Sequence, residues 1–226
     1  KRLNNKEFLD DIKKFIKNTH EFYTDKVPEI NLLANRLHDE YTLSDFYKVF
    51  NRLWRSGYNS ERSLAIHALE QYYNEYDLQT WQVLKPKLAD IKSVDEVDHI
   101  GKIISFIYRR QPSLRAELMR LSTQQNVWIR RIAVFSLYNI IRRKELKESE
   151  LVMKLLPMNI HDRDEDVQKA TGFIIRELGK LKKESIKRFI LKHMTMPDFT
   201  FSIATEHMKD LRKIRRLKKL TNVQRI

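Results

Sequence analysis

One segment recurs four times, with variation, along this chain of 226 residues. Its copies begin at Ser60, Asp95, Asn126 and Asp164, so that successive starts lie 35, 31 and 38 residues apart. Each copy opens on polar residues and continues into a helical pattern that carries a small residue, namely Ala65, Gly101, Ala133, and Ala170 or Gly172. A period in this range without strand signals is typical of stacked helix pairs, because one pair cannot bury its apolar face alone. The sequence therefore predicts an all-α protein with the architecture of an α-solenoid.

Helical spacing of apolar residues continues on both sides of these copies. It predicts helices over residues 5–18, 28–39, 43–56, 60–74, 78–89, 95–110, 113–122, 126–142, 148–156, 164–180, 183–194 and 199–218. Short breaks separate them, and no stretch rich in Pro, Gly and Ser divides the chain. We therefore expect residues 1–226 to form a single domain.

Composition excludes several classes of protein. With 33% charged residues, a mean hydropathy of -0.57 and no apolar run of about 18 residues, no membrane span is expected. The chain has no cysteine, so it lacks a disulfide framework, a Cys-based zinc site and a thiol nucleophile. Its seven histidines show no metal-ligand spacing. We expect a cytoplasmic monomer, associated with the nucleoid in a bacterium, that uses no metal and no cofactor.

Positive charge is in excess, since 44 Lys and Arg stand against 30 Asp and Glu for a net charge of +14. Such a charge attracts polyanions, and nucleic acid is the leading partner. In one alternative, the excess positive charge lies only in the C-terminal tail, as the solvated end of a helix. Basic pairs also occur in successive repeats, however, where stacking would align them along one face: Arg109 and Arg110, Arg130 and Arg131, Arg142 and Arg143, and Lys182 and Lys183.

Two charged residues interrupt apolar helical patterns. Asp98 lies between Val97 and Ile100, and Arg131 lies just before Ile132 and Ala133. An acid at the edge of a buried face needs a partner or a function. It forms a salt bridge between repeats, or it is a carboxylate in a cationic groove that stabilises positive charge on a deoxyribose. Both interpretations can hold together.

Three stretches resemble matching stretches of the bacterial AlkD-type DNA alkylation repair proteins. They are DEVD at Asp95–Asp98, NVWIRRIAV at Asn126–Val134 and DVQKATGFIIRELGK at Asp166–Lys180. The resemblance covers roughly residues 43–210, and it leaves 1–42 as divergent N-terminal helices and 211–226 as a basic C-terminal tail. It implies a fold of HEAT-like repeats with a concave basic face that binds duplex DNA.

The resemblance also implies a reaction, the hydrolysis of the N-glycosidic bond of cationic N3- or N7-alkylpurines without metal or cofactor. It implies that Asp98 is catalytic, that Arg131 contacts DNA near the lesion and that Phe173 lines the cleft. Further residues expected at the DNA-binding surface are Arg130, Trp128, Arg109, Arg110, Lys169 and Arg176. The resemblance further implies that the lesion is recognised largely through the DNA backbone.

The chain departs from the family pattern in three ways. Val94 stands where the family has a tryptophan four residues before the catalytic Asp, and Phe173 stands where it has another. No signature like L-G-I-x-x-P-x-L-R occurs in the N-terminal stretch. Two functional classes therefore stay open: a DNA glycosylase of the alkylpurine type, and a helical-repeat module that binds DNA or an acidic protein without catalysis.

Overall fold

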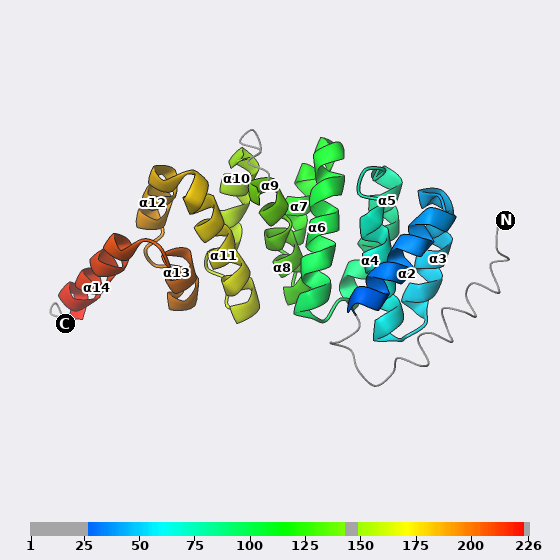
Figure 1. Ribbon diagram of the computed structural model, residues 1–226. Coiled ribbons are helices and arrows are strands. Elements are labelled where there is room, and N and C mark those ends of the chain that lie inside the picture. Colours follow the sequence, from blue (N-terminus) through cyan, green and yellow to red (C-terminus); the bar gives the residue numbers. More distant parts are fainter. Residues whose placement is uncertain (1–26, 143–148, 224–226) are drawn as a thin grey trace. The chain divides into compact units, whose positions relative to one another are not determined.

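The computed structural model describes residues 27–142 and 149–223, with side chains described over 30–142 and 151–217. All regular structure within these ranges is helical (Figure 1), which confirms the all-α prediction. The helix expected over 5–18 lies outside the described residues. The chain divides into two compact units, residues 1–86 and 87–226, and each is described by itself below.

The first unit consists of four α-helices in its described part. They are α2 (Val27–Glu40), α3 (Leu43–Arg55), α4 (Asn59–Gln71) and α5 (Leu78–Leu84), and a 3-10 helix, η1 (Lys85–Asp90), follows. Helix α4 packs against both α2 and α3. Aromatic rings fill the space between them: Phe46 stacks on Tyr72 at a centroid distance of 5.1 Å. The Tyr72 hydroxyl donates a hydrogen bond to the Tyr41 carbonyl at 2.8 Å, so this buried polar group is satisfied.

The second unit holds the three family-like stretches. Its helices are α6 (Val94–Arg110), η2 (Pro112–Leu114), α7 (Arg115–Leu121), α8 (Val127–Phe135), α9 (Leu137–Arg142), α10 (Ser149–Asn159), α11 (Glu165–Leu181), α12 (Lys183–Lys192), α13 (Asp198–Ala204) and α14 (Lys209–Val223). Helix α8 packs against α6 on one side and against α11 on the other. The three stand side by side in Figure 1.

Two expected helices are interrupted. The segment over 126–142 breaks at Ser136, and the segment over 199–218 ends α13 at Ala204 and restarts at Lys209. At the second break the Thr205 hydroxyl donates to the Phe201 carbonyl at 2.7 Å. Ser136 likewise donates to the Ala133 carbonyl at 2.7 Å. Hydroxyl side chains that bond nearby backbone carbonyls compete with helix continuation, and apolar periodicity does not report this.

Small residues do mark close helix contacts, as the sequence predicts. A Cβ on Gly101 would lie 3.3 Å from the Ser136 nitrogen, and one on Gly172 would lie 2.8 Å from the Thr200 carbonyl oxygen. Helix α6 therefore approaches the end of α8 closely at Gly101, and α11 approaches α13 closely at Gly172. Ala65 and Ala133 are fully buried.

Gly172→Ala is expected to lower the free energy of unfolding by about 2 kcal/mol, because its Cβ would meet backbone and the Ile203 Cβ rather than a movable group. Gly179→Ala, on the same helix, is the matched control. A Cβ there would lie 2.8 Å from the terminal methyl of Met208, which can move, and alanine gains about 1 kcal/mol of helix propensity. Urea unfolding measures the free energy of unfolding of both variants. Equal losses would show that the close contact at Gly172 does not set the cost.

Candidate functional site

Helices α6, α8 and α11 each begin at a side chain that caps their free backbone N–H groups. The oxygens of Ser93, Asn126 and Asp164 accept from the Glu96, Trp128 and Asp166 nitrogens at 3.2, 2.9 and 2.9 Å. Asn126 and Asp164 are the polar openers of two repeats, and Ser93 lies two residues before the opener of another, so capping explains why polar residues recur there. The candidate residues lie in the turns that follow, on neighbouring helices.

Asp98 and Arg131 meet between α6 and α8. Asp98 Oδ1 lies 3.7 Å from Arg131 Nη2, and the Asp98 side chain is 42% exposed whereas that of Arg131 is only 4% exposed. Oδ1 itself is buried and accepts no hydrogen bond from the part of the chain that the structure describes. The carboxylate therefore has a guanidinium behind it and solvent on its other side.

The environment of Asp98 disfavours its charged form overall. Desolvation raises the pKa of the carboxyl group above its usual value and is the largest cause, while the positive charge of Arg131 lowers it. Smaller charges act from Asp95 and His99 on the same helix and from Lys169 on α11. A carboxylate with a raised pKa that stays open to solvent is typical of functional sites.

Arg131 joins all three helices. Its Nη1 donates to the Asp166 backbone carbonyl at 2.6 Å and lies 3.6 Å from the Asp166 carboxylate. The sequence-based expectation was a contact between Arg131 and DNA. Because the guanidinium is buried and directed at Asp98 and Asp166, its position favours a role in holding Asp98 over direct contact with a phosphate.

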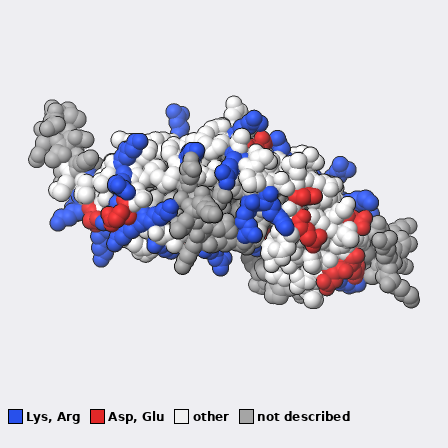
Figure 2. Space-filling view, turned by 90° about the horizontal axis from the view of Figure 1, so that it is seen from above, with Lys and Arg blue, Asp and Glu red and all other residues white. Residues whose placement is uncertain are grey.

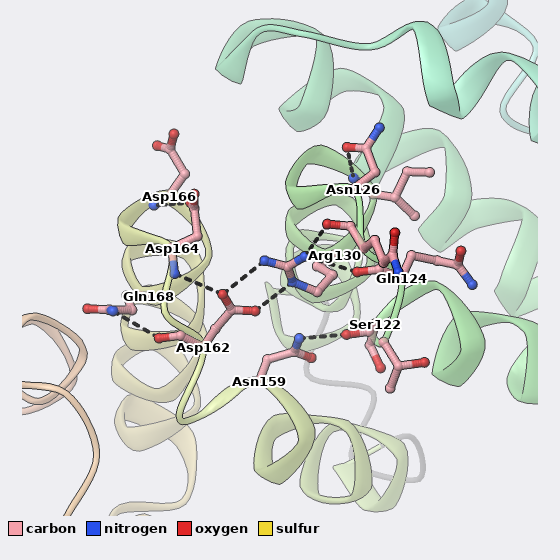
Figure 3. A network of polar contacts seen from close by, with 12 residues as sticks. Ser122, Gln124, Asn126, Arg130, Asn159, Asp162, Asp164, Asp166 and Gln168 are labelled. Atoms are coloured by element: carbon pink, nitrogen blue, oxygen red, sulfur yellow. Dashed lines mark hydrogen bonds and ion pairs between the residues drawn. The ribbon is translucent and has the colours of Figure 1, made fainter.

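Arg130, also expected at the DNA surface, is held within the protein (Figure 3). Its Nε and Nη2 donate to the two carboxylate oxygens of Asp162 at 2.7 and 3.1 Å. Its Nη1 donates to the carbonyls of Gln124 and Gln125 at 2.9 and 2.7 Å. A guanidinium engaged in this way favours a structural role, with the loop before α11 fixed to the start of α8.

Phe173 belongs to a second group of contacts. Its ring lies 5.1 Å from that of Tyr138 and 6.1 Å from that of Phe135. The Arg176 guanidinium lies over the Phe173 ring at 4.9 Å and forms ion pairs with Glu177 at 3.1 Å and with Glu206. Arg176 therefore occupies a face of the aromatic ring that was expected to line a cleft.

The remaining candidates lie at or near the surface. Val94, one turn before Asp98, is 41% exposed, so its position has room for a larger side chain. Lys169, Arg109 and Arg110 are exposed and Trp128 is half-buried. Sequence reasoning missed Asp162 and Asp166, although the acid-rich opener DRDED at 162–166 was a usable signal for a loop that binds arginines.

Positive charge is divided unequally between the units. Residues 1–86 contain 13 Lys and Arg against 13 Asp and Glu, whereas residues 87–226 contain 31 against 17. The whole net charge therefore belongs to the second unit. Lys and Arg side chains are spread along the face drawn in Figure 2, and acidic ones gather in a few patches.

Two arginines of the C-terminal helix α14 bind other parts of the protein. Arg212 donates to the Ser202 carbonyl at 2.7 Å, and Arg215 donates to the Met196 carbonyl at 2.6 Å and to Asp198 at 2.7 Å. The side chains of Lys218 and Lys219 lie outside the described residues. Basic groups of α14 thus anchor it to the segment around α13. No described helix is long and apolar enough to cross a membrane.

Comparison with known proteins places this geometry in a family. The sequence model described as DNA alkylation repair enzyme matches residues 1–208. No curated protein is similar enough to count as a match. Among the solved structures that share the fold, three are described next.

The first is described as a predicted DNA alkylation repair enzyme from Enterococcus faecalis, with 16% identity and a TM-score of 0.70 over 92% of this chain and 98% of that one. The second is AlkD2 from Streptococcus mutans, with 12% identity and a TM-score of 0.71 over 88% and 97%. The third is smu.31 from Streptococcus mutans UA159, with 12% identity and a TM-score of 0.68 over 88% and 98%. Identities this low show the fold alone, and they confirm the helical-repeat architecture.

Proposed function

Since this chain belongs to the family of DNA alkylation repair enzymes, we propose that it binds duplex DNA through its basic second unit and excises cationic alkylpurines. The proposed reaction is hydrolysis of the N-glycosidic bond of N3- or N7-alkylpurines, with Asp98 as the catalytic group. The observation that carries this proposal is the Asp98 carboxylate, open to solvent on one side and backed by the buried Arg131 guanidinium at 3.7 Å.

The chemistry suits a site with one carboxylate. When the bond between C1′ and the purine nitrogen breaks, its electron pair leaves with the base and neutralises the base's positive charge, so no strong general acid is needed. Positive charge then develops on the deoxyribose, where the Asp98 carboxylate stabilises it. Water adds to C1′ and loses its proton to bulk solvent. Arg131 holds the carboxylate in place during these steps.

This role requires an ionised Asp98. Since desolvation raises its pKa, excision is expected to fall with decreasing pH earlier than it would for an ordinary aspartate. Arg131 opposes that shift, so the ion pair widens the pH range in which the carboxylate is charged.

Val94→Trp is expected to increase single-turnover excision about 2- to 30-fold. An aromatic face one turn before Asp98 attracts a cationic sugar by about 0.5–2 kcal/mol, and the exposed position of Val94 leaves room for it. Val94→Leu is the control, because it adds apolar volume without a π face. Equal rates for the two variants would show that cation–π attraction is not the missing element.

A second candidate function is DNA binding without excision. Two observations favour it: Val94 offers no aromatic face, and Arg176 lies over the ring of Phe173. The position of Val94 then offers a cationic sugar no aromatic face, and Arg176 covers one face of Phe173. This alternative predicts that both the wild-type protein and Val94→Trp bind DNA fully and release no base.

A further inference from the structure

The two adjacent arginines of α8 hold the loop before α11 at its two ends. Arg130 binds Asp162 at the beginning of the loop, and Arg131 binds the backbone carbonyl of Asp166 in the first turn of α11. The two guanidiniums belong to consecutive residues, so the loop is fixed to a single turn of α8. Any displacement of the loop must therefore act on one arginine or the other.

Asp162 makes the most contacts in this loop (Figure 3). Its side chain is only 8% exposed, and it accepts both charge-assisted hydrogen bonds from Arg130. Its Oδ1 also accepts the Asp164 N–H at 2.9 Å, and its backbone carbonyl accepts from Gln168 Nε2 at 2.9 Å. A part-buried bidentate pair with two further hydrogen bonds sets the position of the loop backbone.

A chain of contacts leads from Asp162 to Asp98. Asp164, held by Asp162, caps the Asp166 N–H at 2.9 Å, and the Asp166 carbonyl accepts from Arg131 Nη1 at 2.6 Å. The other terminal nitrogen of Arg131 faces Asp98 Oδ1. The guanidinium is planar and rigid, so the hydrogen bond of one nitrogen to Asp166 restricts where the other lies relative to Asp98.

We propose that Asp162 is a positioning residue for Asp98, acting through the loop, the Asp166 carbonyl and the Arg131 guanidinium. It touches neither DNA nor the reacting atoms. The structural part of the proposal stands on the contacts alone, whereas its effect on excision rests on the proposed function. A substitution at Asp162 should therefore change the pKa of Asp98, although the two side chains do not touch.

The charged and titratable groups that face Asp98 set its pKa, which can be measured. They are Asp95 and His99 on α6, Arg131 on α8 and Lys169 on α11. Arg131 is the one in direct contact with both Asp98 and Asp166. If the loop loosens, Arg131 loses its anchor and lowers the pKa of Asp98 less, so that this pKa rises further.

The test compares Asp162→Asn with Asp198→Asn in the full chain. Both changes remove the charge of an aspartate that pairs with an arginine at 2.7 Å in the second unit, but Asp198 pairs with Arg215 and has no part in the loop. The measurement is the pH titration of the Asp98 carboxyl ¹³C signal, assigned by its absence in Asp98→Asn. The pKa is expected to rise in Asp162→Asn and to stay at the wild-type value in Asp198→Asn.

An unchanged Asp98 titration in folded Asp162→Asn would overturn the proposal, as would an equal shift in both variants. If Asp162→Asn does not fold, Arg130→Lys replaces it, because lysine keeps the charge but loses the bidentate fork. A smaller rise is expected there, and none would again overturn the proposal.

Kinetics supply the second readout. The kcat for release from methylated DNA is expected to fall about tenfold in Asp162→Asn with KM changed less than about twofold, because Asp98 is misplaced while DNA contacts remain. An equal kcat would contradict positioning. A wild-type protein that releases no base would refute the proposed function instead, and the titration would still decide the structural part.

Discussion

Asp98→Asn is expected to slow the release of alkylpurine about 100- to 1000-fold while leaving the affinity for duplex DNA nearly unchanged. The amide has the shape of the carboxylate but no charge to place against a developing cation. Arg131, which faces Asp98 at 3.7 Å, would keep its hydrogen bond to the Asp166 carbonyl, so the site should keep its shape. Single-turnover release from methylated duplex measures the loss.

Asp95→Asn is the matched control, since Asp95 is exposed on the same turn of α6 and has no role in the proposed reaction. The stability of Asp98→Asn provides an independent check. A raised pKa means that ionised Asp98 costs stability as pH rises through that pKa. The amide should therefore leave the protein at least as stable as the wild type at neutral pH. Full excision by Asp98→Asn would refute its catalytic role.

Raising the salt concentration from 50 to 200 mM is expected to weaken duplex binding by about 10³-fold or more, as for a protein that contacts six or more phosphates. The physical reason is that the second unit carries 31 Lys and Arg against 17 Asp and Glu, while the first is balanced at 13 and 13. Fluorescence anisotropy over a salt series gives the slope of the logarithm of affinity against the logarithm of salt.

Substitutions of single lysines test which unit binds DNA. Lys169→Ala, at an exposed position near Asp98, is expected to make that slope shallower by about 0.9. Lys48→Ala, at an exposed position of the first unit, is expected to leave it unchanged. Affinity that does not depend on salt, or an equal effect of both lysines, would contradict binding through the second unit.

The helical-repeat fold was largely predictable because apolar residues at helical spacing and small residues recur in each repeat. The helix predicted over 164–180 corresponds to α11, at Glu165–Leu181, and Gly101 and Gly172 lie at close helix contacts. The break after Ala204 was not predictable from periodicity, and at this break the Thr205 hydroxyl bonds the Phe201 carbonyl. Apolar spacing reports which face is buried and is silent about such local competition.

The site was predictable in part. A salt bridge between Asp98 and an arginine of the next repeat was expected as one interpretation, and in the structure Arg131 is that arginine. The different partners of Arg130 and Arg131 were not predictable, because both residues precede the same apolar run. Arg130 binds Asp162 and Arg131 binds the Asp166 carbonyl, and both partners lie in residues 162–166. The aromatic character of Phe173 was readable, but its cover by Arg176 depends on a residue one turn away whose side-chain direction the sequence does not show.

The proposed excision of alkylated purines can be measured directly as the release of free base from DNA. Methylated duplex DNA is incubated with an excess of the wild-type protein, and free 3- and 7-methylpurines are quantified against spontaneous release. Release is expected above the spontaneous rate, slow enough to respond to Val94→Trp and about 100- to 1000-fold slower in Asp98→Asn. Tight binding of the same duplex with release no faster than the spontaneous rate would contradict it.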